Sequence, residues 1–304
     1  MDVKLKRENL YTLKRMLETA EKHTCAVGSF APRYTEMIRP VLLAGEKAKS
    51  PLIVQISQNE LIRYDITCDE FANEFYKVLV EENITVPVVL HLDHTYDFEV
   101  IEAAVKAGFT SVMIDASEKD IDENIVITKK VVEYARARGV SVEAELGRIG
   151  TTDFIETDSD EELFTDPEEA KRFVKETNVD ALAVSVGTAH GVYNVKKPTI
   201  DFKRLQEIRS LTPVHLVLHG GSGVPDHMIQ ESVHLPNGGV SKVNIATDLE
   251  ISLLDALSRE ERMKNAECSD LPAVKLAAGQ KAVEQTVVEK IYRFLKTNGL
   301  AETF

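Results

Sequence analysis

The 304-residue chain has few of the residues that mark fibrous or disulfide-linked proteins. It contains only 15 Gly, 10 Pro and 3 Cys. Such a low share of glycine and proline excludes a collagen-like chain, and a hydrophobic fraction of 43% excludes an intrinsically disordered one. The composition therefore indicates an ordinary globular protein.

The few cysteines also bear on the cellular compartment. Cys25, Cys68 and Cys268 are far apart in the sequence, odd in number and form no C-x-x-C pair. This pattern excludes a disulfide scaffold and is typical of free or buried thiols in a reducing compartment. We expect a cytoplasmic location.

Basic residues and long apolar runs are also scarce. The 36 Lys and Arg are outnumbered by 50 Asp and Glu, so the net charge is −14. A field of this sign repels nucleic acid and anionic membranes, and an anionic substrate would need a locally built pocket. No window approaches the roughly 18 apolar residues of a membrane span, and the N-terminus lacks the apolar core of a signal peptide. We expect neither a nucleic-acid nor a membrane partner.

Eight short runs of apolar and β-branched residues have the length and composition of strands. They are Cys25–Phe30, Pro51–Ser57, Val86–His91, Ser111–Ile114, Val140–Leu146, Ala181–Val186, Val214–His219 and Val240–Ile245. Nearly all are apolar throughout rather than alternating, which is typical of parallel strands covered on both faces.

Amphipathic segments separate these runs, and several begin at Asp, as helices commonly do. Examples are Asp97–Ala107, Asp122–Ala137 and Asp166–Thr177. Eight strand-then-helix units without a linker predict an α/β fold, a closed (β/α)8 TIM barrel formed by a single domain over residues 1–304. Extra helices are expected over residues 1–22 and Leu271–Lys296. An open doubly wound sheet is the alternative, which eight evenly spaced units disfavour.

One segment departs from the average composition. Residues Asp153–Glu169 contain nine acidic residues and no basic one. Most of this segment is expected to be a solvated loop that leads into an acidic helix start. Because it follows the fifth strand, it could also deliver one carboxylate to the catalytic face of a barrel.

Three histidines fall just past three different strand ends. His94, His190 and His219 follow the third, sixth and seventh strands, so their imidazoles could converge above the barrel axis. Three imidazoles with an open fourth position are typical of a catalytic zinc site. A single buried His is more often a hydrogen-bonded core residue, as we expect for His91, but three at corresponding places favour a metal.

Glycine-rich turns follow the seventh and eighth strands. His219-Gly220-Gly221-Ser222-Gly223 and Asn244-Ile245-Ala246-Thr247 occupy the positions where barrels commonly bind phosphate through backbone N–H groups and a hydroxyl. Glycine lets phosphate oxygens approach the backbone because it has no Cβ. A tight turn explains the glycines equally well, so this signal is weak alone.

Six segments in order resemble the motifs of one family. HLDH, SVMIDAS, VEAELG, DALAVSVGTAHGVY, LVLHGGSGVP and KVNIATDL are similar to the successive motifs of the class II, metal-dependent ketose-bisphosphate aldolases. The resemblance covers nearly the whole chain, and an ordered set of this length is much more specific than any single motif. It implies reversible cleavage of a phosphorylated ketose to dihydroxyacetone phosphate and an aldehyde, through an enediolate that zinc stabilises.

The resemblance also implies roles for individual residues. His94, His190 and His219 would hold Zn²⁺, and Asp93 would exchange a proton with the C4 hydroxyl. The dihydroxyacetone-phosphate half would be bound, with a monovalent cation sometimes assisting, by Gly191, Gly220, Gly221, Ser222, Asn244, Ile245, Ala246 and Thr247.

Three further acidic positions are implied. Asp115 and Glu145 resemble positions that bind a second or alternative metal, although a structural hydrogen bond explains each of them as well. The C3 proton shuttle comes from an acidic residue shortly after ELG in the family, and Asp153 is the nearest candidate here. The family also implies a homodimer or a homotetramer.

The departures from the family pattern cluster on the half of the site that would meet the aldehyde. The first strand leads into Ala31-Pro32-Arg33-Tyr34, the second ends Ser57-Gln58-Asn59-Glu60, and Tyr96 follows HLDHT. Ser269–Pro272 lacks the Arg that in relatives reaches the distal phosphate. We therefore expect an aldehyde other than simple glyceraldehyde 3-phosphate. Arg33 could bind a carboxylate, sulfonate or phosphate of that aldehyde, or be a loop residue paired at the surface.

Other functions stay open at this point. A Schiff-base aldolase would need a reactive lysine, and Lys242 lies within the eighth strand. A non-catalytic accessory or sugar-phosphate-binding barrel would be expected to lose the metal ligands, which are present here. An epimerase or isomerase with the same enediolate would exchange substrate protons without cleavage.

Overall fold

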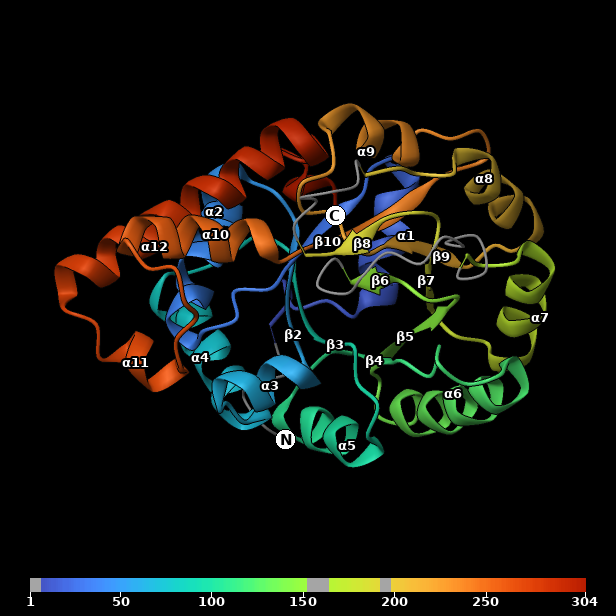
Figure 1. The fold of residues 1–304 in the computed structure, drawn as a ribbon, viewed down its shortest axis with the longest axis horizontal. Coiled ribbons are helices and arrows are strands. Elements are labelled where there is room, and N and C mark those ends of the chain that lie inside the picture. The colour runs from blue at the N-terminus through green and yellow to red at the C-terminus, as the bar shows by residue number, and fades with distance from the viewer. Residues whose placement is uncertain (1–6, 152–163, 192–197) are drawn as a thin grey trace.

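Eight parallel strands close into a barrel in the computed structural model, which describes residues 7–151, 164–191 and 198–304 (Figure 1). The order around the barrel is β1-β10-β9-β7-β5-β4-β3-β2. The strands are β1 (Val27–Phe30), β2 (Leu52–Ser57), β3 (Val88–Asp93), β4 (Ser111–Ile114), β5 (Ser141–Leu146), β7 (Ala181–Val184), β9 (His215–Leu218) and β10 (Val240–Ile245). The predicted TIM barrel is confirmed.

All eight predicted strands are present, and the differences lie at their ends. Ser111–Ile114 and Val240–Ile245 agree at both ends. The third strand begins at Val88 rather than Val86, after Pro87, which has no N–H to donate to a neighbouring strand. It continues to Asp93, so this carboxylate belongs to the rigid strand and not to the loop after it.

Helices surround the barrel. They are α1 (Leu13–Lys22), α2 (Ile38–Ala48), α3 (Gln58–Tyr64), α4 (Cys68–Glu81), α5 (Phe98–Ala107), α6 (Ile121–Arg136), α7 (Pro167–Thr177), α8 (Phe202–Leu211), α9 (Asp226–Val233), α10 (Thr247–Leu257), α11 (Asn265–Ser269) and α12 (Ala273–Glu289). Asp166 caps α7, since its side chain accepts from the N–H groups of Glu168 and Glu169. No helix in the described ranges is long and apolar enough to cross a bilayer.

The extra N-terminal helix, α1, covers the amino end of the barrel. It begins at Leu13, later than the predicted helix over residues 1–22, of which residues 1–6 lie outside the described ranges. Its buried residues Met16 and Leu17 pack against the inward side chains Ile53 and Val89. This apolar plug closes one end of the barrel, so the polar chemistry is confined to the carboxyl ends of the strands.

The predicted C-terminal helix Leu271–Lys296 is α12 followed by a π-helical turn, Lys290–Leu295. Helix α12 packs against α10 and α2 and forms with α10 an arm at the left of Figure 1. Helix α11 lies below this arm and contacts the Thr35–Met37 turn. Short 3-10 turns occupy Thr35–Met37 and Ala301–Thr303.

A small second sheet was not predicted. Strands β6 (Gly150–Thr151) and β8 (Ala189–His190) pair in parallel, and β8 stands near the middle of the view, inside the ring of helices (Figure 1). The sixth barrel strand therefore ends at Val184, and His190 lies on a separate two-residue strand. Strands of two residues are too short for a pattern of apolar residues to reveal them in the sequence.

Candidate active site

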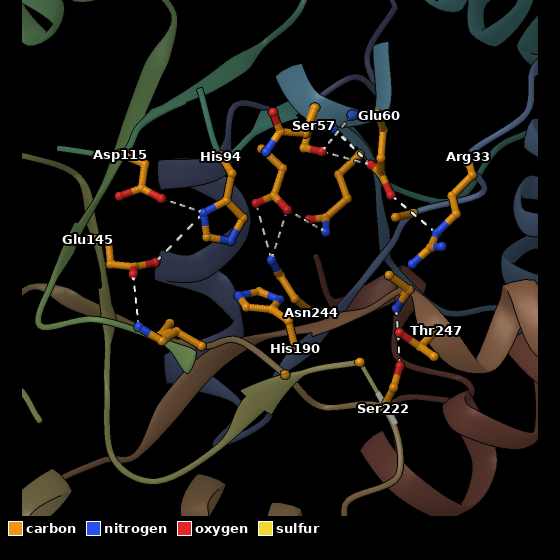
Figure 2. A pocket seen from close by; sticks show the side chains of 18 of the residues that line it. Arg33, Ser57, Glu60, His94, Asp115, Glu145, His190, Ser222, Asn244 and Thr247 are labelled. Atoms are coloured by element: carbon orange, nitrogen blue, oxygen red, sulfur yellow. Dashed lines mark hydrogen bonds and ion pairs between the residues drawn. The ribbon is translucent and has the colours of Figure 1, made fainter. Parts of the chain in front are cut away.

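A cavity of about 380 Å³ opens at the carboxyl ends of the barrel strands (Figure 2). Its lining combines charged and polar side chains from many different strand ends, including His94, Asp115, Glu145, His190 and Asn244. These residues are distant in sequence and meet here because parallel barrel strands all end on one face.

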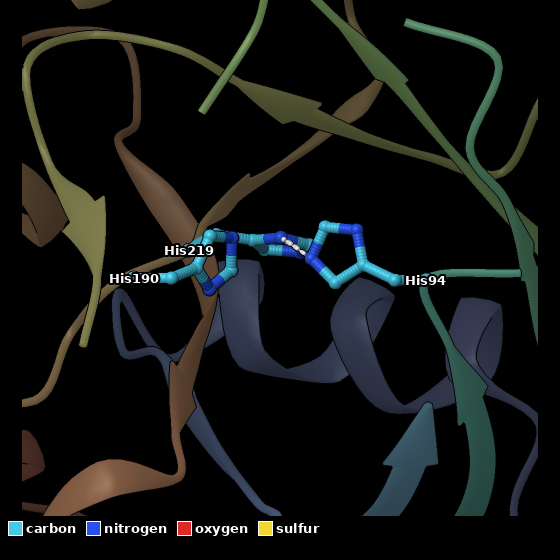
Figure 3. A group of neighbouring side chains, drawn as sticks. All are labelled: His94, His190 and His219. Atoms are coloured by element: carbon cyan, nitrogen blue, oxygen red, sulfur yellow. Dashed lines mark hydrogen bonds between the residues drawn. The ribbon is translucent and has the colours of Figure 1, made fainter. Parts of the chain in front are cut away.

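The three predicted metal-binding histidines come together (Figure 3). The ring centroid of His94 lies 4.9 Å from that of His190 and 4.6 Å from that of His219. One nitrogen from each ring lies within 4.8 Å of the others. His94 follows β3, His190 belongs to β8 and His219 follows β9, so three separate backbone segments fix the rings.

The hydrogen bonds of these rings fit a zinc ion. His94 Nε2 and His219 Nδ1 face each other at 2.8 Å. The outer nitrogens meet carboxylates, with His94 Nδ1 2.8 Å from Asp115 Oδ2 and His219 Nε2 2.9 Å from Glu143 Oε1. An imidazole that donates its outer N–H to a carboxylate presents the lone pair of its inner nitrogen, as zinc ligands do. Glu143 was not predicted, although the two glutamates in the predicted strand Val140–Leu146 were a signal.

The electrostatics around the rings are dominated by burial and by carboxylates. Burial and the two neighbouring rings hold the pKa of His190 well below its usual value, so this imidazole is neutral. Burial opposes the charged form of His94, but Asp93, Asp115 and Glu145 outweigh it and raise the pKa of His94 to about 10. The surroundings therefore favour a positive charge at this point, which a divalent cation can supply in place of the proton.

Asp115 and Glu145 line the wall beside His94. Asp115 also accepts from the Ser117 hydroxyl at 2.7 Å. The buried Oε2 of Glu145 has no hydrogen-bond partner among the described residues and lies 3.8 Å from His94 Nδ1 and 3.6 Å from His219 Nδ1. Burial and Asp115 raise the pKa of Glu145 well above its usual value. Asp115, Glu145 and His94 thus form a second set of three ligand atoms within 4.8 Å.

Asp93 is held by two amides. Its carboxylate accepts from Gln55 Nε2 at 3.0 Å and from Asn244 Nδ2 at 3.1 Å. Burial opposes ionisation, but His94, His91 and Lys242 outweigh it, and the pKa of Asp93 lies well below its usual value. Asp93 is therefore an ionised base of fixed orientation. Gln55 was missed by the sequence analysis, although a polar residue inside the apolar run of β2 was a signal.

The residues predicted to bind phosphate follow the ends of β9 and β10. The Ser222 hydroxyl accepts from the N–H groups of Ala246 and Asp248, both at 3.2 Å, which ties the turn after β9 to the start of α10. Gly220 has a φ of +66°, and a Cβ there would lie 2.4 Å from the Ala189 carbonyl oxygen. Glycine is therefore required at this turn for both backbone conformation and space.

The predicted substrate residues divide into two groups. Most line the cavity, namely Arg33, Gly191, Gly220, Ser222, Asn244, Ala246 and Thr247. Gly221 and Ile245 are not part of its lining, and the Ile245 side chain is fully buried. Asp153 lies outside the described residues.

Arg33 is buried in an ion-pair network. Its Nε lies 3.3 Å from Glu60 Oε1, and its Nη1 contacts the Glu250 carboxylate. Glu250 also accepts from the Tyr64 hydroxyl at 3.1 Å and, through both oxygens, from Arg262 at 2.8 and 3.0 Å. The capping box that begins α3 holds Glu60, because its carboxylate accepts from the Ser57 N–H.

Two further arginines line this end of the cavity and were not predicted. Ser269–Pro272 has no Arg, but the loop before α11 brings Arg262 to the cavity, and α3 contributes Arg63. Among the described residues, the Arg63 guanidinium has no ion-pair partner; its backbone carbonyl accepts from Lys264 Nζ at 2.8 Å. Tyr96 also belongs to the lining.

Lys242 does not line the cavity. Its side chain is fully buried inside the barrel, where Nζ donates to Glu143 Oε2 at 2.8 Å. An ammonium held in this way is not placed to attack a substrate carbonyl, which argues against the Schiff-base alternative.

Known proteins are similar to this chain in sequence and in fold. The model of the family "Fructose-bisphosphate aldolase class-II" matches residues 11–299. The fructose-bisphosphate aldolase of Geobacillus stearothermophilus is 40% identical over 286 residues, which cover 94% of this chain and 97% of that protein. A fructose-bisphosphate aldolase of Helicobacter pylori (strain J99) is 42% identical over 262 residues, 79% of this chain and 83% of that protein.

A solved structure agrees with these matches. The YdjI aldolase of Escherichia coli K12 superposes with a TM-score of 0.80 at 32% identity, covering 96% of this chain and 99% of that one. The chain therefore belongs to the class II fructose-bisphosphate aldolase family, the zinc-dependent aldehyde-lyases that act on sugar phosphates, and it is a metal-dependent aldolase.

Proposed function

We propose that this aldolase reversibly cleaves a ketose 1-phosphate into dihydroxyacetone phosphate and an aldehyde. One observation carries the proposal, namely that three imidazole nitrogens from separate segments gather within 4.8 Å beside the ionised carboxylate of Asp93. The relatives are named fructose-bisphosphate aldolases, so fructose 1,6-bisphosphate is the first ketose to assay.

His94, His190 and His219 would hold the zinc ion. A Lewis acid there stabilises the negative charge that the ketose oxygens acquire when the bond next to the carbonyl breaks. The buried Glu145 oxygen without a hydrogen bond supports Glu145 as an additional ligand or as part of an alternative metal position. Asp115 accepts from His94 in the structure, which favours an orienting role over direct ligation.

Asp93 removes the proton of the C4 hydroxyl as the carbon–carbon bond breaks, and returns it in the reverse direction. Gln55 and Asn244 each donate to its carboxylate, which keeps the base in one orientation. The C3 proton shuttle is assigned to Asp153, and this assignment stays a prediction.

The dihydroxyacetone-phosphate half would bind on the side of β9 and β10. Gly191, the Gly220–Ser222 turn and the Asn244–Thr247 segment supply backbone groups, two hydroxyls and the N-terminus of α10, where the helix dipole favours an anion. The buried Oδ1 of Asn244 has no hydrogen-bond partner among the described residues, so it can accept from a substrate hydroxyl. A monovalent cation is proposed as an additional aid to phosphate binding.

The aldehyde half would lie toward the end of β2 and α3. Arg33 already faces two carboxylates, so we assign it a supporting role in which it holds Glu60 and Glu250 in place. Arg63, whose guanidinium has no ion-pair partner among the described residues, then offers accessible positive charge at this end of the cavity, as does Arg262, which pairs with Glu250 but is half-exposed. Direct anion binding was one of the two expectations for Arg33, and the paired arrangement differs from it. The accessible arginines favour an aldehyde that carries an anionic group, whose identity stays a prediction.

We also propose that the enzyme is a homodimer or homotetramer of the cytoplasm. The arm formed by α10 and α12 exposes Ile251 and Val274, the latter with 84% of its surface accessible, as a self-association surface would. The three cysteines have free, buried thiols, as expected in a reducing compartment. Light scattering on the purified protein measures the oligomeric state.

Metal analysis and turnover test the proposal together. The purified enzyme should contain zinc and release dihydroxyacetone phosphate from at least one member of a panel of ketose phosphates. A chelator should abolish the release and zinc should restore it. Full activity without a metal, or trapping of a lysine adduct by borohydride, would overturn the proposal. Exchange of substrate protons without cleavage would indicate an epimerase or isomerase instead.

A further inference from the structure

We propose that Lys242 is a positioning residue, which aligns the metal-binding ring of His219 through the carboxylate of Glu143. The inference rests on the proposed metal-binding role of His219. It assigns a role to two fully buried charged residues that the mechanism above does not use.

Three side chains form a continuous chain of hydrogen bonds from the barrel interior to the metal ligands. Lys242 Nζ donates to Glu143 Oε2 at 2.8 Å, and Glu143 Oε1 lies 2.9 Å from His219 Nε2. On the other side of the His219 ring, Nδ1 faces Nε2 of His94, the next proposed metal ligand, at 2.8 Å. The side chains of Lys242, Glu143 and His219 are all 0% exposed, so water cannot replace any of these partners.

The Lys242 ammonium occupies the centre of an acidic interior. It lies 3.4 Å from His91 Nε2 and 4.0 Å from Asp93 Oδ1, in addition to its contact with Glu143. Ligand atoms of His91, Asp93 and Glu143 lie within 4.8 Å of one another, a grouping that is typical of a cation site. The protein thus supplies its own cation, the Lys242 ammonium, at this inner position. Buried carboxylates without a partner would be strongly destabilising.

The Glu143 carboxylate is therefore fixed at both oxygens. Its Oε2 is held by an ammonium on β10, and its Oε1 receives the outer N–H of His219 after β9. This contact determines which nitrogen of the His219 ring carries the proton and which presents its lone pair to the metal. Without Lys242, Oε2 loses its partner, and the carboxylate is free to turn away from the imidazole.

His94 provides a contrast that makes the proposal specific. Its outer nitrogen contacts Asp115, which lines the cavity and is also held by the Ser117 N–H and hydroxyl. The carboxylate that orients His94 is thus fixed locally, whereas the carboxylate that orients His219 depends on Lys242, 99 residues away in the sequence. Loss of Lys242 should affect the His219 ring and leave the His94 ring in place.

The test compares neutral replacements of the pair. In Lys242→Met the carboxylate stays without its cation. In Lys242→Met with Glu143→Gln both charges are removed, but the Gln carbonyl can still accept from His219. In Lys242→Met with Glu143→Leu both charges and the acceptor are removed. The zinc dissociation constant is measured by competition with a chelator, and the His219 tautomer from the ¹⁵N shifts of its ring.

We expect Lys242→Met to weaken zinc binding by about 10- to 100-fold. The Gln double variant should recover most of this loss, and the Leu double variant should not. As a control, Arg209→Met breaks a partly buried ion pair, Arg209 to Glu21 at 3.4 Å, near the covered end of the barrel, and should leave zinc affinity unchanged. If Lys242→Met does not fold, the two double variants alone decide the role of the acceptor.

Wild-type zinc affinity and an unchanged His219 tautomer in Lys242→Met would overturn the inference, as would equal affinities of the two double variants. These results differ from a failure of the proposed function, in which the wild-type protein itself would bind no zinc or cleave no ketose phosphate.

Discussion

The two halves of the cavity are built in different ways. On the metal and phosphate half, the functional groups sit on or directly after barrel strands, and carboxylates such as Asp115 and Glu143 hold them. On the aldehyde half, they come from α3, α10 and the loop before α11. The first half is fixed by the barrel, and the second by ion pairs among helices and loops. We therefore propose that the first half carries the chemistry of the family and that the second half selects the aldehyde.

The largest expected effect lies at the centre of the metal half. Substituting His219→Ala removes one of three proposed ligands, so the zinc content should fall to near zero and kcat/KM by about 10³-fold or more. Metal analysis and an assay of dihydroxyacetone phosphate release measure both. His227→Ala, an exposed histidine on α9, is the matched control and should behave as wild type. A His219→Ala enzyme with full zinc and activity would contradict the assignment.

Asp93→Asn tests the role of the base independently of metal binding. The amide keeps the shape of the side chain but cannot take the C4 hydroxyl proton, so kcat should fall by about 10²- to 10⁴-fold with the zinc content unchanged. Stopped assays of the cleavage reaction, together with metal analysis, check this. Loss of zinc in parallel with activity would instead make Asp93 part of the metal site.

Gly220→Ala tests the phosphate turn. The new Cβ would lie 2.4 Å from the Ala189 carbonyl oxygen, next to His190, so both stability and affinity for the phosphorylated substrate should fall. Gly139→Ala has a similar positive φ of +73° but meets nothing within 4 Å, and should cost only about 1 kcal/mol of unfolding free energy. Equal effects of the two substitutions in thermal unfolding and in KM would show that the turn is not tightly packed.

The smallest effect is expected on the aldehyde half. Arg262→Ala removes a half-exposed guanidinium and should change the relative kcat/KM for charged and uncharged aldehydes by about 10-fold in the condensation direction, with the rate for the best uncharged aldehyde retained. Arg33→Ala should instead lower the melting temperature, because it leaves Glu60 without its ion-pair partner and leaves Glu250 with Arg262 alone. An unchanged preference in Arg262→Ala would place the aldehyde elsewhere in the cavity.

The metal half was predictable from the sequence because strand ends meet at one face of a barrel. Once the strand of HLDH and the strand before HGGSG were recognised, His94 and His219 had to lie close together. His190 joins the other two rings, as the sequence predicts, but it lies on the two-residue strand β8, which is too short to leave a pattern.

The aldehyde half was not predictable in the same way. Arg33 and Glu250 are 217 residues apart, and no periodicity links the loop after β1 to α10. The left-handed backbone of Arg33, with φ of +65°, turns its side chain inward, which no residue preference would suggest. The role of Lys242 was equally unpredictable, because the sequence around a lysine in an apolar strand does not indicate which glutamate it pairs with.

The most direct test of the account is X-ray absorption at the zinc edge of the purified enzyme. We predict imidazole nitrogens at about 2.0–2.1 Å as the main protein ligands, with one fewer around whatever zinc His219→Ala binds when it is loaded with an excess of the metal. Sulfur ligands, or a zinc shell that the substitution leaves unchanged, would contradict the three-histidine site on which the mechanism depends.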